Sequence, residues 1–386
     1  MAEIVTQKPV SATLHSLTHV DGLPSSYARE NTRPEPAVLN ATKSYSLDSL
    51  PLELALGKNV SLDHLSDTVS RYSSTGLIRR LLNNHGAILF KGLGLKNATE
   101  FSQFATAFGW LPHEDIGNPV RRTVLAHNVA TANEGPNTQP VYPHNEFGLS
   151  PHYPAYVFFY ALSAPETGGE TPINSSIKLY ERLEEEIPEF LTALEEKGVR
   201  YQLFFPNRPR EDVSSPGTSV FQSYGKAVLD TDDTETARSK IEAEIRRLPT
   251  ATWQWENQSS ENPLGDLRVF QKLPAIRLHE QTGKKAFFNN IISRYLNAKN
   301  NQTLDPPYLN KEGAYQPPAL YADGSPIPHE YLEKAVQIVE ETRSLVSWTA
   351  GDVLLLDNHA IQHGREPWTG DRKLLASLWD ESKQSK

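Results

Sequence analysis

The chain has 386 residues, 38% of them hydrophobic and 22% charged, which is the composition of an ordinary globular protein with one large core or two modest ones. Its net charge of −9 offers no basic surface for phosphates, so we expect no nucleic-acid partner. It contains no cysteine, and this excludes disulfides, thiolate metal ligands and cysteine nucleophiles.

The N-terminal part gives the first expectations about organisation and location. No apolar run approaches the ~18 residues that a membrane span needs, and the first residues lack the pattern of a signal peptide. We therefore expect no membrane partner and, by default, a cytoplasmic location. Residues 1–45 are polar and show neither the helical nor the strand period, which predicts a flexible N-terminal arm. Residues 46–386 are then expected to form a single domain, while nothing indicates an oligomeric state.

The first predicted elements alternate between helix and strand. Residues 63–82 have helical spacing, and residues 86–92 form a short apolar run bounded by glycines, as in a buried strand. A helix is expected to begin after Asn97, a plausible cap, because Phe101 and Phe104 then share one face with the residues that follow.

The middle of the chain combines one clear strand with helices. Residues 156–161 are the most strand-like segment, and they end at a Gly- and Pro-rich turn over residues 164–171. Helical spacing follows over residues 177–187, and Pro188 opens a second helix that ends near residue 197. Two polar stretches, residues 127–140 and 205–220, are expected to be loops that line the substrate pocket, the second as a mobile flap.

The C-terminal half is rich in strands. Helices are predicted over residues 237–247 and 330–343, and a buried strand over residues 353–356. Trp253 and Trp255 alternate as in a strand and are expected to belong to the core. No βα alternation repeats here, so the pattern favours a mainly β protein with flanking helices, that is, an α+β chain with a double-stranded β-helix, or jelly-roll, core.

The first motif that suggests chemistry is His144-Asn145-Glu146. On an extended strand this spacing points the imidazole and the carboxylate to the same face. The two side chains would form two corners of an open metal site, and one distant histidine would complete the set of two histidines and one carboxylate that is typical of non-haem Fe(II).

The distant partner is expected near the C-terminus. His363 follows the predicted strand 353–356, so it can lie on another strand of the same barrel. Nine residues later, Arg372 opens a final apolar strand, and its guanidinium could bind a dicarboxylate cosubstrate with two hydrogen bonds. Arg365 is the alternative to Arg372, and His359 is the alternative to His363, although Asp357 and Asn358 indicate a turn there rather than a helix that pairs the two histidines.

Together these motifs make the chain resemble the taurine dioxygenase superfamily of Fe(II)/2-oxoglutarate enzymes, in particular its clavaminate synthase-like branch. The resemblance covers roughly residues 86–379. It rests on several short segments, namely residues 86–92, 131–134, 144–146, 168–171, 282–285, 351–358 and 363–365. The chain departs from the wider superfamily at Glu146, where aspartate is usual, but the clavaminate synthase-like branch tolerates glutamate.

The resemblance implies roles for particular residues. His144, Glu146 and His363 match the ligands of Fe(II), while Arg372 and Thr171 match the residues that bind the distal carboxylate of 2-oxoglutarate. It also implies a reaction in which 2-oxoglutarate and O2 are consumed, succinate and CO2 are released, and a small substrate undergoes hydroxylation, desaturation or cyclisation. Asn133 and Glu134 are offered only as candidates for contact with that substrate.

The substrate itself is not named by the sequence. A small polar metabolite, such as an amino acid or an amide-bearing intermediate of specialised metabolism, is the expectation. Two other functions stay open: a zinc hydrolase built on the same three ligands, which would need a separate general base, and a catalytically inactive binding protein on the same barrel.

Overall fold

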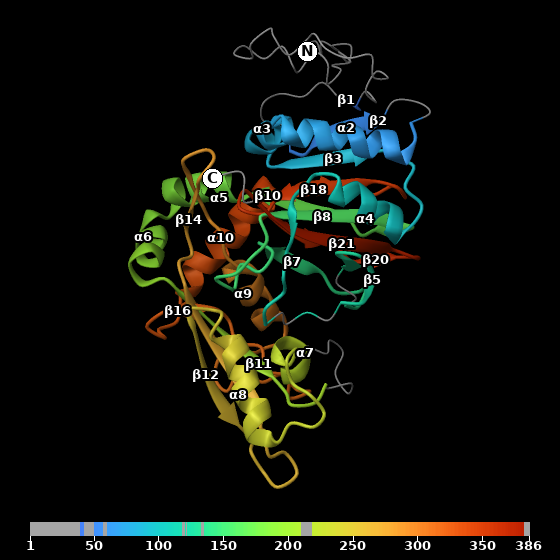
Figure 1. Cartoon of the computed structure of the whole chain (residues 1–386). Helices are drawn as coiled ribbons and strands as arrows, with labels where there is room; N and C mark the ends of the chain where they lie inside the picture. Colours follow the sequence, from blue (N-terminus) through green and yellow to red (C-terminus); the bar gives the residue numbers. More distant parts are fainter. Residues whose placement is uncertain are drawn as a thin grey trace.

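The computed structural model describes most of the chain (Figure 1). The described residues are 39–41, 50–56, 60–117, 120, 122–132, 135–209 and 218–381. The expected arm, residues 1–45, lies outside them except for Leu39–Ala41, which form strand β1. Residues 210–217 of the expected flap also lie outside them. The division into an arm and a single domain therefore stays a prediction.

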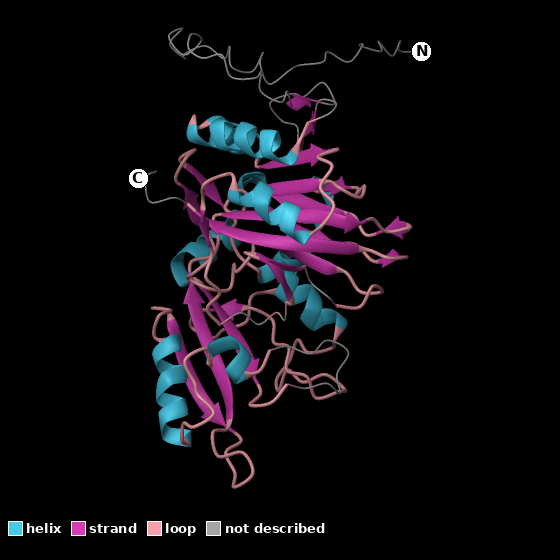
Figure 2. Cartoon of the chain, turned by 45° about the vertical axis from the view of Figure 1, so that its right-hand side comes forward, coloured by secondary structure: helices cyan, strands magenta, loops and turns pink. Residues whose placement is uncertain are grey.

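A large sheet of nine strands forms a broad layer, and its strands lie one below another in Figures 1 and 2. Its strands, in spatial order, are β1, β2 (Leu52–Leu56), β3 (Ala87–Lys91), β18 (Val353–Asp357), β8 (Tyr156–Ser163), β21 (Lys373–Asp380), β6 (Val129–Thr131) and β5 (Val124–Ala126), and β4 (Leu111–Pro112) pairs with β21. The predicted strands 86–92, 156–161 and 353–356 are confirmed, as is the final strand after Arg372.

A small sheet of four strands faces the large one. In spatial order it contains β17 (Ser344–Val346), β10 (Thr171–Ser175), β19 (Ile361–Arg365) and β7 (Val141–His144). Along the chain, β6, β8, β18 and β21 of the large sheet alternate with β7, β10, β17 and β19 of the small sheet, except that β10 and β17 of the small sheet follow each other across an insertion. This alternation is that of a jelly roll, so the predicted fold is confirmed, although the two sheets are not closed into a barrel.

Apolar side chains fill the space between the two sheets. They include Val157 and Phe159 of β8, Leu354 and Leu356 of β18, and Ile173 of β10. Because successive residues of a strand point to opposite faces, the remaining residues of β8 and β18 are directed to the outer face of the large sheet.

Three helices cover that outer face: α2 (Leu62–Ser74), α3 (Leu77–His85) and α4 (Ala98–Thr106). The helix predicted after Asn97 is confirmed, and the Asn97 side chain accepts a hydrogen bond from the Glu100 amide. The single helix predicted over residues 63–82 is wrong, because Gly76 has a φ of 71° and separates α2 from α3.

A long insertion lies between β10 and β17. It contains α5 (Ser176–Glu186), α6 (Pro188–Lys197), β11 (Val199–Phe205), α7 (Val220–Tyr224), α8 (Thr234–Ile245), β12 (Ala251–Glu256), β13 (Asp266–Leu273), β14 (Arg277–His279), β15 (Lys284–Ala286), α9 (Ile291–Asn300), β16 (Leu320–Tyr321) and α10 (His329–Thr342). Helices α5, α6, α9 and α10 pack into one apolar cluster, and α7 and α8 pack on the third sheet, whose order is β12-β13-β11-β16. Figure 1 shows that third sheet at the end of the molecule far from β1.

Two tryptophans of the insertion differ from expectation. Trp253 and Trp255 do lie on a strand, β12, but they are only half-buried, because β12 is the edge strand of the third sheet. Two arginines lie over their rings: Arg238 of α8 is 5.0 Å from the centre of Trp255, and Arg246, which directly follows α8, is 5.2 Å from the centre of Trp253.

Among the described residues, no helix is long and apolar enough to cross a membrane.

Candidate metal and cosubstrate site

Strand pairing brings the two histidines together. Strands β7 and β19 are antiparallel neighbours, and His363 lies directly opposite His144. The expectation that His144 and Glu146 share a strand face is wrong in detail, because β7 ends at His144 and Glu146 lies in the turn that follows. Phe147 in that turn has a φ of 55°, and the turn still directs the carboxylate to the imidazoles.

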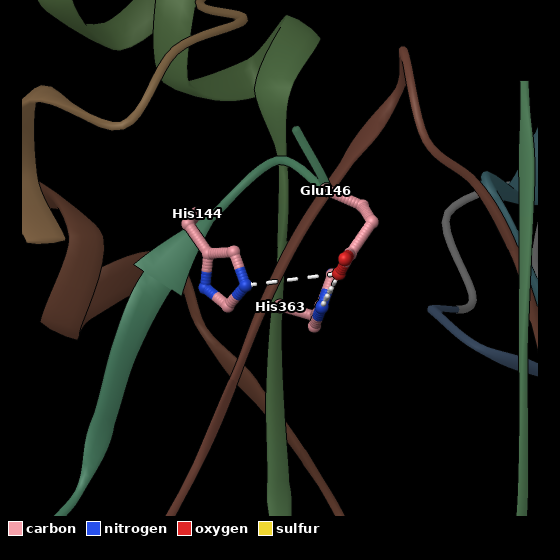
Figure 3. A group of neighbouring side chains, drawn as sticks. All are labelled: His144, Glu146 and His363. Atoms are coloured by element: carbon pink, nitrogen blue, oxygen red, sulfur yellow. Dashed lines mark ion pairs between the residues drawn. The ribbon is translucent and has the colours of Figure 1, made fainter. Parts of the chain in front are cut away.

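The three predicted ligands form one compact cluster (Figure 3). Glu146 Oε2 lies 3.9 Å from His144 Nε2 and 3.3 Å from His363 Nε2. One ligand atom from each residue lies within 4.8 Å of the other two, so the cluster could hold one divalent metal ion. Two imidazole nitrogens and one carboxylate oxygen fit non-haem iron and leave the other coordination positions open.

Neighbouring groups fix the imidazole of His144. Its Nδ1 lies 2.8 Å from the Tyr142 carbonyl oxygen, which can only accept, so Nδ1 donates and Nε2 keeps its lone pair for a metal. The His363 ring packs between His144 and Phe159, with ring centres 4.4 and 5.0 Å away. Both rings are therefore held in place before a metal binds.

A buried amide network holds the turn that carries Glu146. The Asn358 side chain accepts a hydrogen bond from the Glu146 amide at 2.8 Å and donates one to the Glu146 carbonyl at 2.9 Å. The side-chain amide of Asn145 donates hydrogen bonds to the backbone carbonyls of Asn358 and Ile361, at 2.7 and 3.1 Å. Both asparagines are fully buried, so these hydrogen bonds fix the turn against the loop between β18 and β19.

Arg122 is a member of the site that the sequence analysis missed. Its Nη2 donates to Glu146 Oε1 at 2.5 Å, which leaves Oε2 for the histidine side of the cluster. Burial favours a raised pKa for Glu146, but the charges of Arg122 and the two imidazoles outweigh it and hold the pKa below its usual range. Burial also lowers the pKa of His144, to about 4. At neutral pH the cluster therefore offers an ionised carboxylate and a neutral His144.

The predicted cosubstrate residues line the same cavity as the three ligands. This cavity has a volume of about 110 Å³, and its walls include Thr171, Arg365 and Arg372. Thr171 is buried, and its hydroxyl accepts a hydrogen bond from Trp348 Nε1 at 3.0 Å. The hydroxyl proton of Thr171 can in turn be donated to a ligand.

The two candidate arginines are held differently. Arg372 donates from Nε to the Gly169 carbonyl at 2.9 Å. Arg365 donates from Nη2 to the carbonyls of Pro136 and Gln139, at 3.0 and 2.8 Å. Burial lowers the pKa of both arginines to about 10, and the positive charge of Arg365 helps to lower that of Arg372. Both side chains therefore stay cationic at neutral pH.

The remaining predicted residues divide into two groups. His359 lies in the turn between β18 and β19, as expected, and its ring contacts Tyr153 and Phe288 rather than the metal cluster. Asn133 and Glu134 lie outside the described residues. Arg122 had no signal in the sequence, since no period or motif spacing relates it to Glu146, 24 positions later.

This jelly roll places two histidines and one carboxylate at a cavity that also contains arginines, which is a donor set of mononuclear non-haem metal enzymes. Residues 49–379 match the taurine catabolism dioxygenase TauD, TfdA family, and the chain belongs to that family. It is accordingly an Fe(II)/2-oxoglutarate-dependent dioxygenase, with Fe(II), 2-oxoglutarate and O2 as its cofactor and cosubstrates.

Two curated relatives match over most of their length. The chain is 28% identical to a clavaminate synthase-like protein of Arabidopsis thaliana over 347 residues, which cover 90% of the chain and 94% of the relative. It is 26% identical to the dapdiamide synthesis protein DdaC of Enterobacter agglomerans, covering 81% of the chain and 88% of the relative. The first match agrees with the predicted clavaminate synthase-like branch.

Solved structures of similar proteins were also found. A taurine dioxygenase from Burkholderia xenovorans is 17% identical, with a TM-score of 0.45, and the match covers 87% of this chain and 88% of the other. A protein named AAD-2, solved with Mn(II) and N-oxalylglycine, is 13% identical, with a TM-score of 0.44, and the match covers 89% of this chain and 98% of the other.

Proposed function

We propose that the dioxygenase oxidises a small polar metabolite by hydroxylation, desaturation or cyclisation, and that His144, Glu146 and His363 are its iron ligands. The observation that carries this proposal is the cluster of three ligand atoms within 4.8 Å of one another, in a cavity that Arg372 and Thr171 also line. The relative named for dapdiamide synthesis supports a biosynthetic role, with an amino acid or amide-bearing intermediate as substrate.

The residues of the site have separate tasks in this proposal. Bound iron, 2-oxoglutarate and O2 supply the oxidising chemistry, with succinate and CO2 as by-products. His144, Glu146 and His363 would hold the metal, and Arg122 holds one oxygen of Glu146 so that the other oxygen is available as a ligand. Arg372 and Thr171 bind the far carboxylate of 2-oxoglutarate by charge-assisted hydrogen bonds, which orients the cosubstrate.

The cavity also bears on the two alternative functions. A zinc hydrolase on the same ligands would need a separate general base to activate water. Among the described residues that line the cavity, Glu146 is the one carboxylate, and it is itself a ligand. An inactive binding protein would not need to keep the complete ligand set together with a buried cationic clamp. The lack of a second carboxylate among these lining residues disfavours the hydrolase, and the ligand set with its cationic clamp disfavours the inactive binding protein. Both observations therefore favour the dioxygenase.

The test is anaerobic titration of the purified protein with Fe(II) and then 2-oxoglutarate, followed by the metal-to-ligand charge-transfer band. The band should appear for the wild type and be absent from His144→Ala and His363→Ala. Addition of O2 should then release succinate in an iron-dependent manner. Tight zinc binding with no response to 2-oxoglutarate would instead support the hydrolase, and a complete absence of iron-dependent succinate would support the inactive binding protein.

A further inference from the structure

A second cavity adjoins the one that contains the metal ligands. It has a volume of about 490 Å³, against about 110 Å³ for the first, and both cavities are lined by Val120 and Arg122. The second cavity lies between the large sheet and α7, with Ala130 and Leu378 on the sheet side and Gln222 on the helix side. Its size and its position next to the metal cluster are what a primary-substrate site requires.

The charged side chains that line the first cavity carry an excess of positive charge. The described lining of this cavity contains three arginines, Arg122, Arg365 and Arg372, but one carboxylate, Glu146. The two positive charges of Fe(II) and the two negative charges of 2-oxoglutarate cancel each other, so the excess of arginine charge persists in the loaded enzyme. An anionic substrate would reduce that excess.

Arg122 is the arginine at the junction of the two cavities. Its side chain is only 14% exposed, and Nη2 is paired with Glu146 Oε1 at 2.5 Å. Among the described residues, Glu146 is the one hydrogen-bond acceptor of this guanidinium, and Nε is buried without an acceptor. A guanidinium has five N–H donors, so Arg122 has further donors for a second carboxylate.

We infer that the second cavity is the primary-substrate site and that it selects a substrate with a free carboxylate, which pairs with Arg122. This inference rests on the proposed function, since it places the substrate beside the iron ligands. The rest of the substrate would contact a wall of mixed character. This wall is apolar at Val124, Val129 and Leu378, polar at Asn128 and Gln222, and carries one charge of each sign at Asp115 and Lys226. The site thus takes a small carboxylic acid with both apolar and polar groups.

The first experiment compares matched pairs of ligands. The probes are the standard amino acids and their N-acetyl derivatives, each as the free acid and as the primary amide, added to the anaerobic Fe(II)/2-oxoglutarate protein at saturating 2-oxoglutarate. Binding is measured by the shift of the charge-transfer band. At least one acid should bind, and its amide should bind about 30-fold more weakly or worse, because the charge pair with Arg122 is lost. Equal binding of acids and amides, or binding of no acid, would overturn the inference.

Variants of Arg122 then test the residue itself. Arg122→Gln should abolish the preference for the acid over its amide, and Arg122→Lys should restore it in part, because a lysine keeps the charge but not the planar fork. Arg80→Gln, at an exposed position on α3, is the matched control and should keep the full preference. A preference that survives in Arg122→Gln would show that another group selects the acid.

Variants of the second cavity separate this inference from the proposed function. Ala130→Phe on β6 and Gln222→Trp on α7 fill the second cavity from opposite walls, and neither residue lines the first cavity. In both variants the charge-transfer band should form at wild-type concentrations of 2-oxoglutarate, which also reports a folded protein, while the response to the acid is lost. If the wild type forms no band, the proposed function fails. If the band forms and both filled variants still bind the acid as the wild type does, the location in the second cavity is wrong.

Discussion

Two buried regions of the molecule are held by different interactions. One is the outer face of the large sheet, and the other is the corner between β7 and β19, which contains His144, Glu146 and His363. On the outer face, aromatic rings pack edge to face, and Phe104 lies 5.6 Å from Phe90 and 6.4 Å from Phe158. At the corner, Asn358 and Asn145 hold Glu146 by directed hydrogen bonds. Apolar packing tolerates small shifts, whereas a metal site does not, so changes on the outer face should cost stability and changes at the corner should cost activity.

Loss of a metal ligand should have the largest effect on activity. His144→Ala, Glu146→Ala and His363→Ala should each abolish iron-dependent succinate release, because each removes a donor from a set of three, and each should keep most of the fold. Succinate formation and thermal melting followed by circular dichroism measure the two properties. His359→Ala is the control and should retain most of the turnover. Full turnover in His363→Ala would contradict the ligand assignment, and equal loss in His359→Ala would leave the distal ligand undecided.

The opposite pattern is expected on the outer face. Phe104→Ala removes a fully buried ring and should lower the free energy of unfolding by about 3–5 kcal/mol. Its folded fraction should bind iron and 2-oxoglutarate as the wild type does. Chemical denaturation and the charge-transfer titration test the two parts. Phe221→Ala, at a ring that is 41% exposed, should cost much less stability. A Phe104→Ala protein with weakened cosubstrate binding but unchanged stability would show that the two regions are coupled.

Arg372 tests the cosubstrate side of the corner. Arg372→Ala should weaken 2-oxoglutarate binding by about 2–5 kcal/mol, roughly 30-fold to several thousand-fold, because it removes one partner of a buried charge pair. Iron binding should be nearly unchanged, and Arg372→Lys should fall between the two. Titration of the charge-transfer band measures all three. A wild-type curve for Arg372→Ala, with a displaced curve for Arg365→Ala, would assign the clamp to Arg365.

The comparison also explains which features could be predicted from the sequence. The elements of the outer face follow from local patterns: the glycine-bounded strand β3 and the capped helix α4 with Phe101 and Phe104 on one face. The three ligands could be predicted because His-x-Glu is a short motif and His363 follows a recognisable buried strand. Gly76 shows the limit, since its left-handed conformation divides a pattern that reads as one continuous helix.

The rest of the corner depends on contacts between distant residues. Asn145 and Asn358 meet across 213 positions of the chain, and Arg122 reaches Glu146 without any motif spacing. Polar residues in turns usually contact solvent or the adjacent backbone, so sequence alone gave no reason to bury these three. The pairing of β7 with β19 brings Asn145 and Asn358 together, and Arg122 reaches Glu146 from the segment before β5.

The pH dependence of stability should reveal how tightly His144 is enclosed. Its pKa is about 4 in the folded protein and 6.5 without burial, so below pH 6.5 the unfolded chain binds a proton that folded His144 does not. Above pH 6.5 the protonation of His144 should not lower the free energy of unfolding of the metal-free protein. As the pH falls to about 4, that free energy should decrease by up to about 3 kcal/mol. Urea denaturation with a chelator at pH 7 and pH 4.5 measures this. His144→Gln should lose less on acidification, and an identical loss would contradict the assignment to His144.

The smallest expected effect lies at the start of α4, on the outer face. Asn97 Oδ1 accepts a hydrogen bond from the backbone amide of Glu100 at 3.0 Å, and Glu100 Oε2 accepts one from the backbone amide of Lys96 at 2.9 Å. Asn97→Ala leaves a helical N–H without its partner and should lower the free energy of unfolding by about 1 kcal/mol, as for other N-caps. Asn97→Ser should keep most of that energy, because its hydroxyl can accept the same hydrogen bond.

Asn84 on α3 provides the matched control for this cap. It is exposed and lies in the last turn of α3, so Asn84→Ala should leave stability unchanged or raise it slightly, since alanine has the higher helix propensity. Neither substitution should change the affinity for 2-oxoglutarate, because α4 packs on the face of the large sheet away from the metal cluster. Urea denaturation and the charge-transfer titration on the same preparations decide the matter. Asn97→Ala with weaker 2-oxoglutarate binding would show that the outer face helps to position the corner, and the separation of the two regions would then be wrong.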